Sequence, residues 1–196
     1  MKNILSFSIA LMCSVVLFTS CLKDDDDNNT TEGLSKEQIH NCYLQMAGEH
    51  TGKLFFLKRE NSSSKSDSID ITWTVVSDSV ITIHSVPAEI LASTIENEPI
   101  KTAIIETMGK VDMKVYYLPY KTSPITFTDY PNPLQANIFY NNATHTVTFG
   151  FVISTYSWGT FENKKMRMQM VLDGIYLDNS TYSYLTTQAP LLIEER

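Results

Sequence analysis

Hydrophobic and polar positions change their spacing along the chain, first following a helical period and then alternating. Between residues 35 and 47, apolar positions recur every three or four residues and form one stripe: Ile39, Cys42, Tyr43 and Met46. Ser35 and Gln38 have the spacing of a capping box, and Gly48 favours the left-handed conformation that ends many helices. The pattern therefore predicts a short N-terminal helix over about 35–47.

Alternation of apolar and polar residues begins after this helix and predicts antiparallel strands. Ile69, Ile71, Trp73 and Val75 alternate with polar residues, which is typical of a half-buried strand. Similar segments give eight or nine predicted strands, over 51–59, 69–75, 80–85, 111–117, 125–127, 136–140, 147–153, 166–172 and 174–178, with a weaker edge at 182–185. Residues 61–66 and 154–163 are expected to be loops.

A helical insertion at about 87–108 interrupts the strands. Pro99 stands at the expected first position of its second helix, where the missing amide costs nothing, and Gly109 is placed to end it. A closed barrel needs about eight strands and removes exposed sheet edges. We therefore predict a mainly β fold over 34–196, an antiparallel lipocalin-like barrel, with a two-sheet sandwich as the alternative.

The first twenty residues have the layout of a secretory signal peptide. Lys2 supplies a positive start, and the uncharged run from Ile4 to Phe18 is shorter than the roughly 20 residues of a membrane span. Thr19-Ser20-Cys21 follows and resembles the bacterial lipobox, although Phe18 stands where that motif usually has leucine. The resemblance implies that Cys21 becomes the acylated N-terminus of the mature protein, held in the membrane by two or three acyl chains.

The residues after Cys21 suggest where the lipoprotein is displayed. Lys23-Asp24-Asp25 resembles the surface-export signal of Bacteroidetes lipoproteins, and residues 21–33 read as an acidic, lipidated tether. The resemblance implies an outer-membrane protein facing the cell exterior, with periplasmic retention as the alternative. The overall layout is similar to that of uncharacterised lipoproteins of gut Bacteroidetes, in which a short helix precedes a calycin-like β domain.

Charge and cysteine content narrow the classes of partner and chemistry. The formal charge of −7 becomes −8 when Lys2 leaves with the signal peptide, and no basic stripe is present, so nucleic acid is not an expected partner. With Cys13 removed and Cys21 acylated, Cys42 is left alone, and no intramolecular disulfide can form. We expect Cys42 to be a buried structural thiol.

Motifs for catalysis or metal binding are not apparent in the sequence. The four histidines do not pair in a zinc-binding pattern, and there is neither a glycine-rich phosphate loop nor a Gly-x-Ser-x-Gly elbow. We expect solvated histidines, no catalytic residue, no metal and no cofactor, and therefore a protein that is not an enzyme. Alternate methionines over 166–170 are expected to fill the core.

The clearest candidate for binding is an aromatic group, Tyr156, Trp158 and Phe161, in the predicted loop 154–163. Flat rings among hydroxyl and amide groups could stack on a glycan or a small apolar ligand. The alternative is that these rings fold back and fill the core. Asp67-Ser68-Ile69 and Asp78-Ser79-Val80 also resemble Bacteroidetes O-glycosylation acceptors, although serine and aspartate are ordinary turn residues.

Two functions remain open from the sequence. The first is a lipid-anchored binding module for a glycan or a small apolar ligand. The second is a structural or accessory protein that partners an outer-membrane complex through a sheet edge or through the helical insertion.

Overall fold

Ser35 begins the first helix, α1 (Lys36–Met46), in a computed structural model that describes residues 33–60, 63–153, 155–185 and 187–196. The predicted capping box is confirmed: the Ser35 hydroxyl accepts from the Gln38 amide at 3.2 Å, and the Gln38 side chain accepts from the Ser35 N–H at 2.8 Å. Gly48, with φ of 120°, does not cap the helix but begins the first strand. The predicted signal peptide, Cys21 and Lys23-Asp24-Asp25 lie outside the described residues.

Ten strands and two further helices follow α1 in the described part of the chain. In order these are β1 (Gly48–Glu60), β2 (Ser63–Ser77), β3 (Val80–Pro87), α2 (Ala88–Leu91), α3 (Glu98–Met108), β4 (Lys110–Thr122), β5 (Ile125–Pro131), β6 (Leu134–Tyr140), β7 (Ala143–Phe151), β8 (Trp158–Glu162), β9 (Lys165–Leu177) and β10 (Ala189–Glu195).

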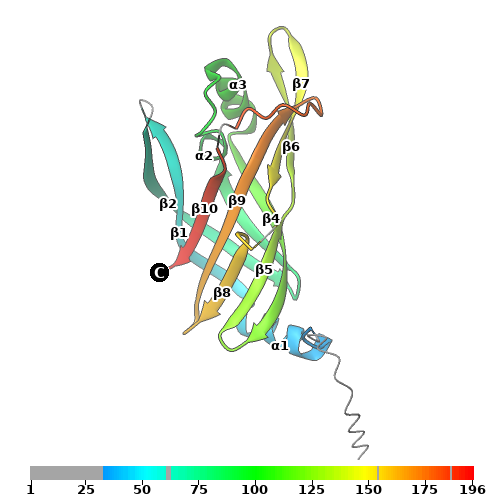
Figure 1. The fold of residues 1–196 in the computed structure, drawn as a ribbon. Coiled ribbons are helices and arrows are strands. Elements are labelled where there is room, and N and C mark those ends of the chain that lie inside the picture. The colour runs from blue at the N-terminus through cyan, green and yellow to red at the C-terminus, as the bar shows by residue number, and fades with distance from the viewer. Residues whose placement is uncertain (1–32, 61–62, 154, 186) are drawn as a thin grey trace, which may run out of the picture. The chain divides into compact units, whose positions relative to one another are not determined.

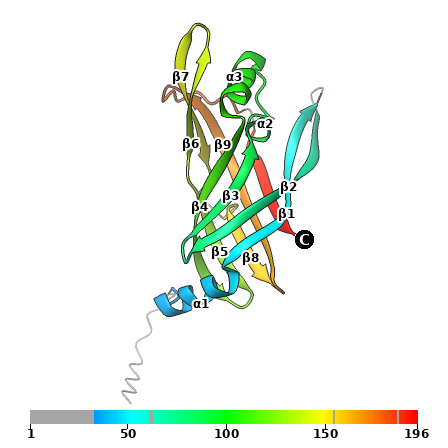
Figure 2. The same cartoon turned by 180° about the vertical axis from the view of Figure 1, so that it is seen from behind.

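Eight of these strands form a closed antiparallel barrel in the order β10-β1-β2-β3-β4-β5-β8-β9, and β9 pairs back with β10. This closure confirms the predicted barrel and rules out the two-sheet sandwich. The β6–β7 hairpin extends the sheet beyond the barrel, because β7 pairs with the C-terminal half of β9. Helices α2 and α3 lie at the end of the barrel opposite α1 (Figures 1 and 2).

The strand that closes the barrel was not predicted. β10 pairs with β1 over Leu192–Glu195 and with β9 over Ala189–Glu194. A second difference concerns β9, which is one continuous strand of 13 residues instead of the two predicted segments. The described residues between β9 and β10 make isolated bridges at Ser183 and Leu185, so the predicted edge at 182–185 does not form a regular strand.

Two predicted loops contain paired residues. Ser63–Ser66 pair with Leu57–Glu60, so the β1–β2 hairpin runs further than the alternating pattern indicated. The predicted loop 154–163 contains β8, which lies between β5 and β9. In both cases backbone pairing with a long neighbouring strand outweighs a local sequence rich in serine, threonine or glycine.

The helical insertion follows its predicted layout closely. The Asn97 side chain caps α3 by accepting from the Ile100 amide at 3.2 Å, and Pro99 lies in the first helical turn. Gly109, with φ of 55°, ends the helix, and its N–H donates to the Ile105 carbonyl at 3.0 Å. The inner face of α3 is buried through Ile100 and Ile104 and packs on β6.

Inward-facing side chains fill the barrel. The set includes Trp73, Phe127 and the predicted methionine ladder, and each of its members is at most 1% exposed: Trp73, Phe127, Met166, Met168 and Met170. Gly159 of β8 faces this core, and a Cβ atom there would overlap the Phe127 ring. The described interior is therefore a packed core at this level, as in other eight-stranded barrels whose lumens are filled by side chains.

Candidate functional site

The three predicted ligand-binding rings do not share one surface. Tyr156 is exposed in the turn before β8, and Trp158 points outward from β8, with the Arg167 guanidinium 5.6 Å from its ring centroid. Phe161 lies three residues further along the strand and so faces the other way. It packs against the core, 6.4 Å from the His50 ring in an edge-on contact.

Of the two serines that resemble glycosylation acceptors, Ser68 lies in β2 and is half-buried, and Ser79 is exposed in the β2–β3 turn.

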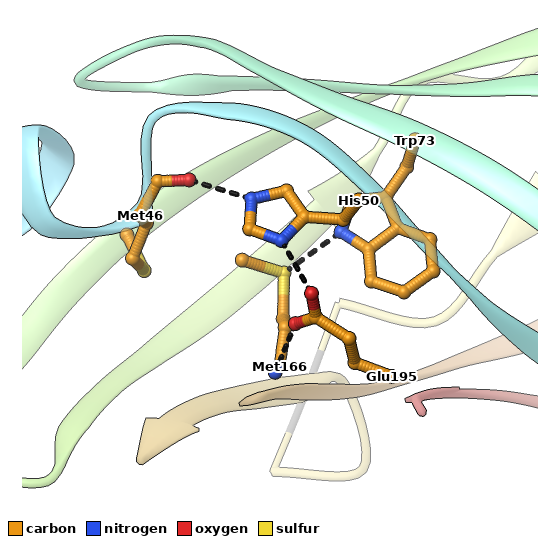
Figure 3. A network of polar contacts seen from close by, with 5 residues as sticks. All are labelled: Met46, His50, Trp73, Met166 and Glu195. Atoms are coloured by element: carbon orange, nitrogen blue, oxygen red, sulfur yellow. Dashed lines mark hydrogen bonds and ion pairs between the residues drawn. The ribbon is translucent and has the colours of Figure 1, made fainter. Parts of the chain in front are cut away.

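A polar network lies where α1 leads into β1, close to the end of β10 (Figure 3). His50 Nε2 lies 2.7 Å from the Met46 carbonyl oxygen, and Nδ1 lies 2.9 Å from Glu195 Oε1. The other Glu195 oxygen accepts from the Met166 N–H at 2.7 Å. Trp73 stacks on the His50 ring at 5.6 Å and donates its indole N–H to the Met166 sulfur at 3.2 Å.

The geometry of this network assigns its protons and its role. A carbonyl oxygen only accepts, so His50 Nε2 donates to Met46, and Nδ1 faces Glu195 Oε1. Both ring nitrogens and both carboxylate oxygens therefore have partners within the protein. The two side chains are only 10% and 16% exposed. His50 is thus not the solvated histidine that we predicted; with Glu195 it joins α1, β1, β9 and β10.

Asp129 is a buried acid that the sequence analysis missed. It lies on β5 opposite Tyr117 of β4, and its exposed fraction is 0%. Neither carboxyl oxygen has a hydrogen-bond partner among the described residues. The hydroxyl of Tyr117 donates to the Ser77 carbonyl at 2.9 Å. Burial raises the pKa of Asp129 to about 8. The alternation of Ile125 and Phe127, continued by two residues, would have placed Asp129 inside.

A cleft lies beside the helical insertion. Its other wall is the part of the β1–β2 hairpin that pairs with neither β10 nor β3. Its volume is about 210 Å³. Its floor is apolar and comes from three elements: Phe56 of β1, Ile69 of β2 and Ile90 of α2. The Ser93 hydroxyl donates to the Leu57 carbonyl at 2.9 Å and ties the segment after α2 to the wall of the cleft.

Charged side chains line the rim of this cleft. Lys58 and Lys101 supply positive charge, and Asp67 and Glu89 supply negative charge. Lys101 lies 3.3 Å from Glu98, whereas Lys58 and Glu89 make no ion pair with any other residue in the described part of the chain. The volume lies below the range of roughly 300–1,000 Å³ that is usual for drug-sized ligands. The cleft thus suits a single small ring or a short alkyl chain with polar ends.

Other chemistry is sparse in the described residues. They contain no group of three or more His, Cys, Asp and Glu side chains placed to hold a metal ion. None of the helices in these ranges has the length and apolar character that a membrane crossing requires. Cys42 is buried on α1, and burial raises the pKa of its thiol, which disfavours the reactive thiolate.

The His50–Glu195 network predicts unequal roles for the two glutamates that end β10. Glu195→Ala leaves His50 and the Met166 N–H without an acceptor and should lower the free energy of unfolding by roughly 2–4 kcal/mol. Glu194→Ala removes a more exposed ion pair with Arg167 and should cost less than about 1 kcal/mol. Chemical denaturation measures both variants. Equal losses would show that the network does not stabilise the barrel.

Asp129 predicts a specific pH dependence of stability. The carboxyl ionises near pH 4 in the unfolded chain but near 8 when folded, so the folded state binds more protons in between. Its contribution to stability is therefore full below pH 4 and is lost as pH rises towards 8, by up to about 1.4 kcal/mol per pH unit.

Asp129→Asn should remove this component of the slope, whereas the exposed control Asp173→Asn should keep it. Denaturation midpoints at a series of pH values give the comparison. A slope that persists unchanged in Asp129→Asn would exclude a buried neutral carboxyl.

Comparison with known proteins places this architecture in a family. A family model described as a domain of unknown function, DUF4840, matches residues 45–177. Searches of curated proteins and of solved structures found no match. The matched range includes the lining of the cleft, His50 and Asp129, and ends with β9, before the closing strand and Glu195. Since the match covers about two thirds of the sequence, the chain belongs to the DUF4840 family.

Proposed function

We propose that this protein is a lipid-anchored outer-membrane lipoprotein, displayed on the cell surface, whose barrel domain is a non-catalytic binding module for a glycan or a small apolar ligand. The observation that carries the proposal is the cleft beside α2, with its apolar floor and charged rim. A sugar ring offers one apolar face for Phe56 and Ile69, and its hydroxyls suit charged neighbours such as Lys58 and Glu89.

The state of the barrel interior supports this choice of site. Phe127, Trp73 and the methionine ladder occupy the space that a ligand would need in an open eight-stranded barrel. His50 and Glu195 use their polar atoms on each other and on the backbone, which favours a non-catalytic role. The cleft, by contrast, has Lys58 and Glu89 on its rim, and these two side chains make no ion pair with another described residue.

The N-terminal sequence supports the anchor and its location. The leader, the lipobox-like Thr19-Ser20-Cys21 and the acidic segment from Lys23 to Asp27 together resemble an exported Bacteroidetes lipoprotein. Acylation of Cys21 would hold the domain at the membrane without a spanning helix.

One observation favours the second function, an accessory partner of an outer-membrane complex. Among the described strands β6 pairs with β7 alone and so lies at the edge of the sheet, and Phe139 on it is 67% exposed. An edge strand with an exposed aromatic residue can pair with a strand of another protein. Stoichiometric capture of one outer-membrane protein, lost in a Phe139→Lys variant, would favour this alternative.

The cleft predicts a charge-specific loss of binding. Monosaccharides and short alkyl carboxylates serve as probes, and ligand-observed NMR detects those that bind. For a probe that binds, Lys58→Ala should weaken affinity roughly tenfold, the equivalent of about 1.4 kcal/mol. Lys53→Ala is the matched control, because Lys53 lies on the same strand but outside the cleft, near Asp70. Binding that ignores Lys58 but fails in Trp158→Ala would move the site to β8.

The anchor predicts a single essential cysteine. In cells fed a labelled fatty acid, Cys21→Ala should abolish acyl labelling and release the protein from the membrane fraction, because the lipobox-like motif directs the acyl chains to Cys21. Cys13→Ala, within the same leader, should leave both unchanged. Labelling that survives in Cys21→Ala would contradict lipidation at this position.

A further inference from the structure

An exposed apolar face lies on the outside of the barrel around β4. Tyr116, Leu118 and Tyr120 alternate outward along this strand and are 42%, 50% and 57% exposed. Directly paired residues share a face, so Val80 of β3 and Tyr130 of β5 flank Tyr116 on the same side. These five residues, named here the β4 face, form a contiguous surface in which tyrosine predominates.

The chemistry of the β4 face suits the boundary between lipid and water. Tyrosine combines an apolar ring with a hydroxyl and is enriched at the headgroup level of membranes. Lys114 adds a cation to this surface, with its ammonium 4.7 Å from the centroid of the Tyr116 ring. A long lysine side chain can lie along apolar surface and keep its charge at the headgroups.

The position of the β4 face relative to the start of the described chain supports a lipid occupant. The described residues begin at Gly33, and the helix that follows, α1, packs against β4 and β2. Two further exposed apolar side chains lie on those elements, Leu44 of α1 and Val76 of β2. Cys21 is twelve residues before Gly33, and twelve residues span at most roughly 40 Å when fully extended.

We propose that the β4 face docks on the headgroup region of the membrane that holds the lipid anchor. This rests on the proposed acylation of Cys21 but adds to it a defined orientation: the barrel lies with β4 against the lipid. The helical insertion lies at the opposite end of the barrel from α1 (Figure 2), and the cleft is lined by residues of that insertion.

The test uses the full acylated chain in vesicles of phosphatidylethanolamine and phosphatidylglycerol. Leu118→Cys carries an environment-sensitive fluorophore, and Phe139→Cys on β6 is the matched control, since both replace an exposed apolar side chain. Cys42 is buried and the Cys21 thiol is acylated, so labelling is confined to the introduced cysteine. Flotation with the vesicles reports the anchor, and quenching by lipids with a headgroup nitroxide reports docking.

Docking predicts that the label at 118 is quenched at least about twofold more strongly than the label at 139, as expected for insertion at the headgroup level. Flotation with equal quenching at both positions overturns docking and leaves the anchor intact. Failure to float overturns the anchor and the docking together. A blue shift at 118 that grows with protein concentration without lipid would assign the β4 face to a second copy of the chain and overturn the proposal.

Discussion

The fold depends on the insertion of the last strand between β1 and β9. Without β10 the other seven barrel strands would form a sheet with two open edges, at β1 and β9. With it, each described barrel strand has a neighbour on both sides. β10 and β1 approach each other closely at Gly52 of β1, because a Cβ atom there would overlap the carbonyl oxygen of Glu194. At the end of β10, Glu195 reaches His50 and the Met166 amide, so that charge-assisted hydrogen bonds add to strand pairing at the closure.

Closure and a filled interior together determine where chemistry can occur. Large side chains such as Trp73 and Phe127 fill the interior that β10 closes. Among the described residues, Asp129 is the one fully buried carboxyl group, and burial keeps it neutral up to a pH of about 8. Lys58 and Glu89, at the rim of the cleft, are charged groups that make no ion pair with another described residue. The barrel therefore serves as the support for the surfaces that we propose for recognition, which lie outside the core: the β1–β2 hairpin, the helical insertion and the outer face of β4.

Local signals in the sequence predicted most of the elements, and non-local pairing determined the rest. Ser35 with Gln38, and Pro99 with Gly109, act within a few residues, so the helices could be predicted from them. β10 could not, because its neighbour β1 lies far away in the sequence and Leu191-Leu192-Ile193 is too short a run to specify a strand alone. Trp158 and Phe161 were assigned to a loop for the same reason: β5 and β9, not local composition, make β8 a strand.

The candidate site was less predictable than the fold. Phe56, Ile69 and Ile90 come from three elements, and nothing in their spacing indicates that they form one floor. His50 illustrates the same point, since its partner Glu195 is 145 residues away. Asp129 is the exception, because the alternation of β5 already placed it on the inward face.

Amide hydrogen exchange along β10 tests the central claim most directly. If β10 closes the barrel, the amides of Leu192 and Ile193 should exchange only through global unfolding, with the same free energy as those of β1 and β9. Exchange of β10 at a clearly lower free energy, while β1 and β9 stay protected, would show a barrel that opens at this seam and would contradict the account.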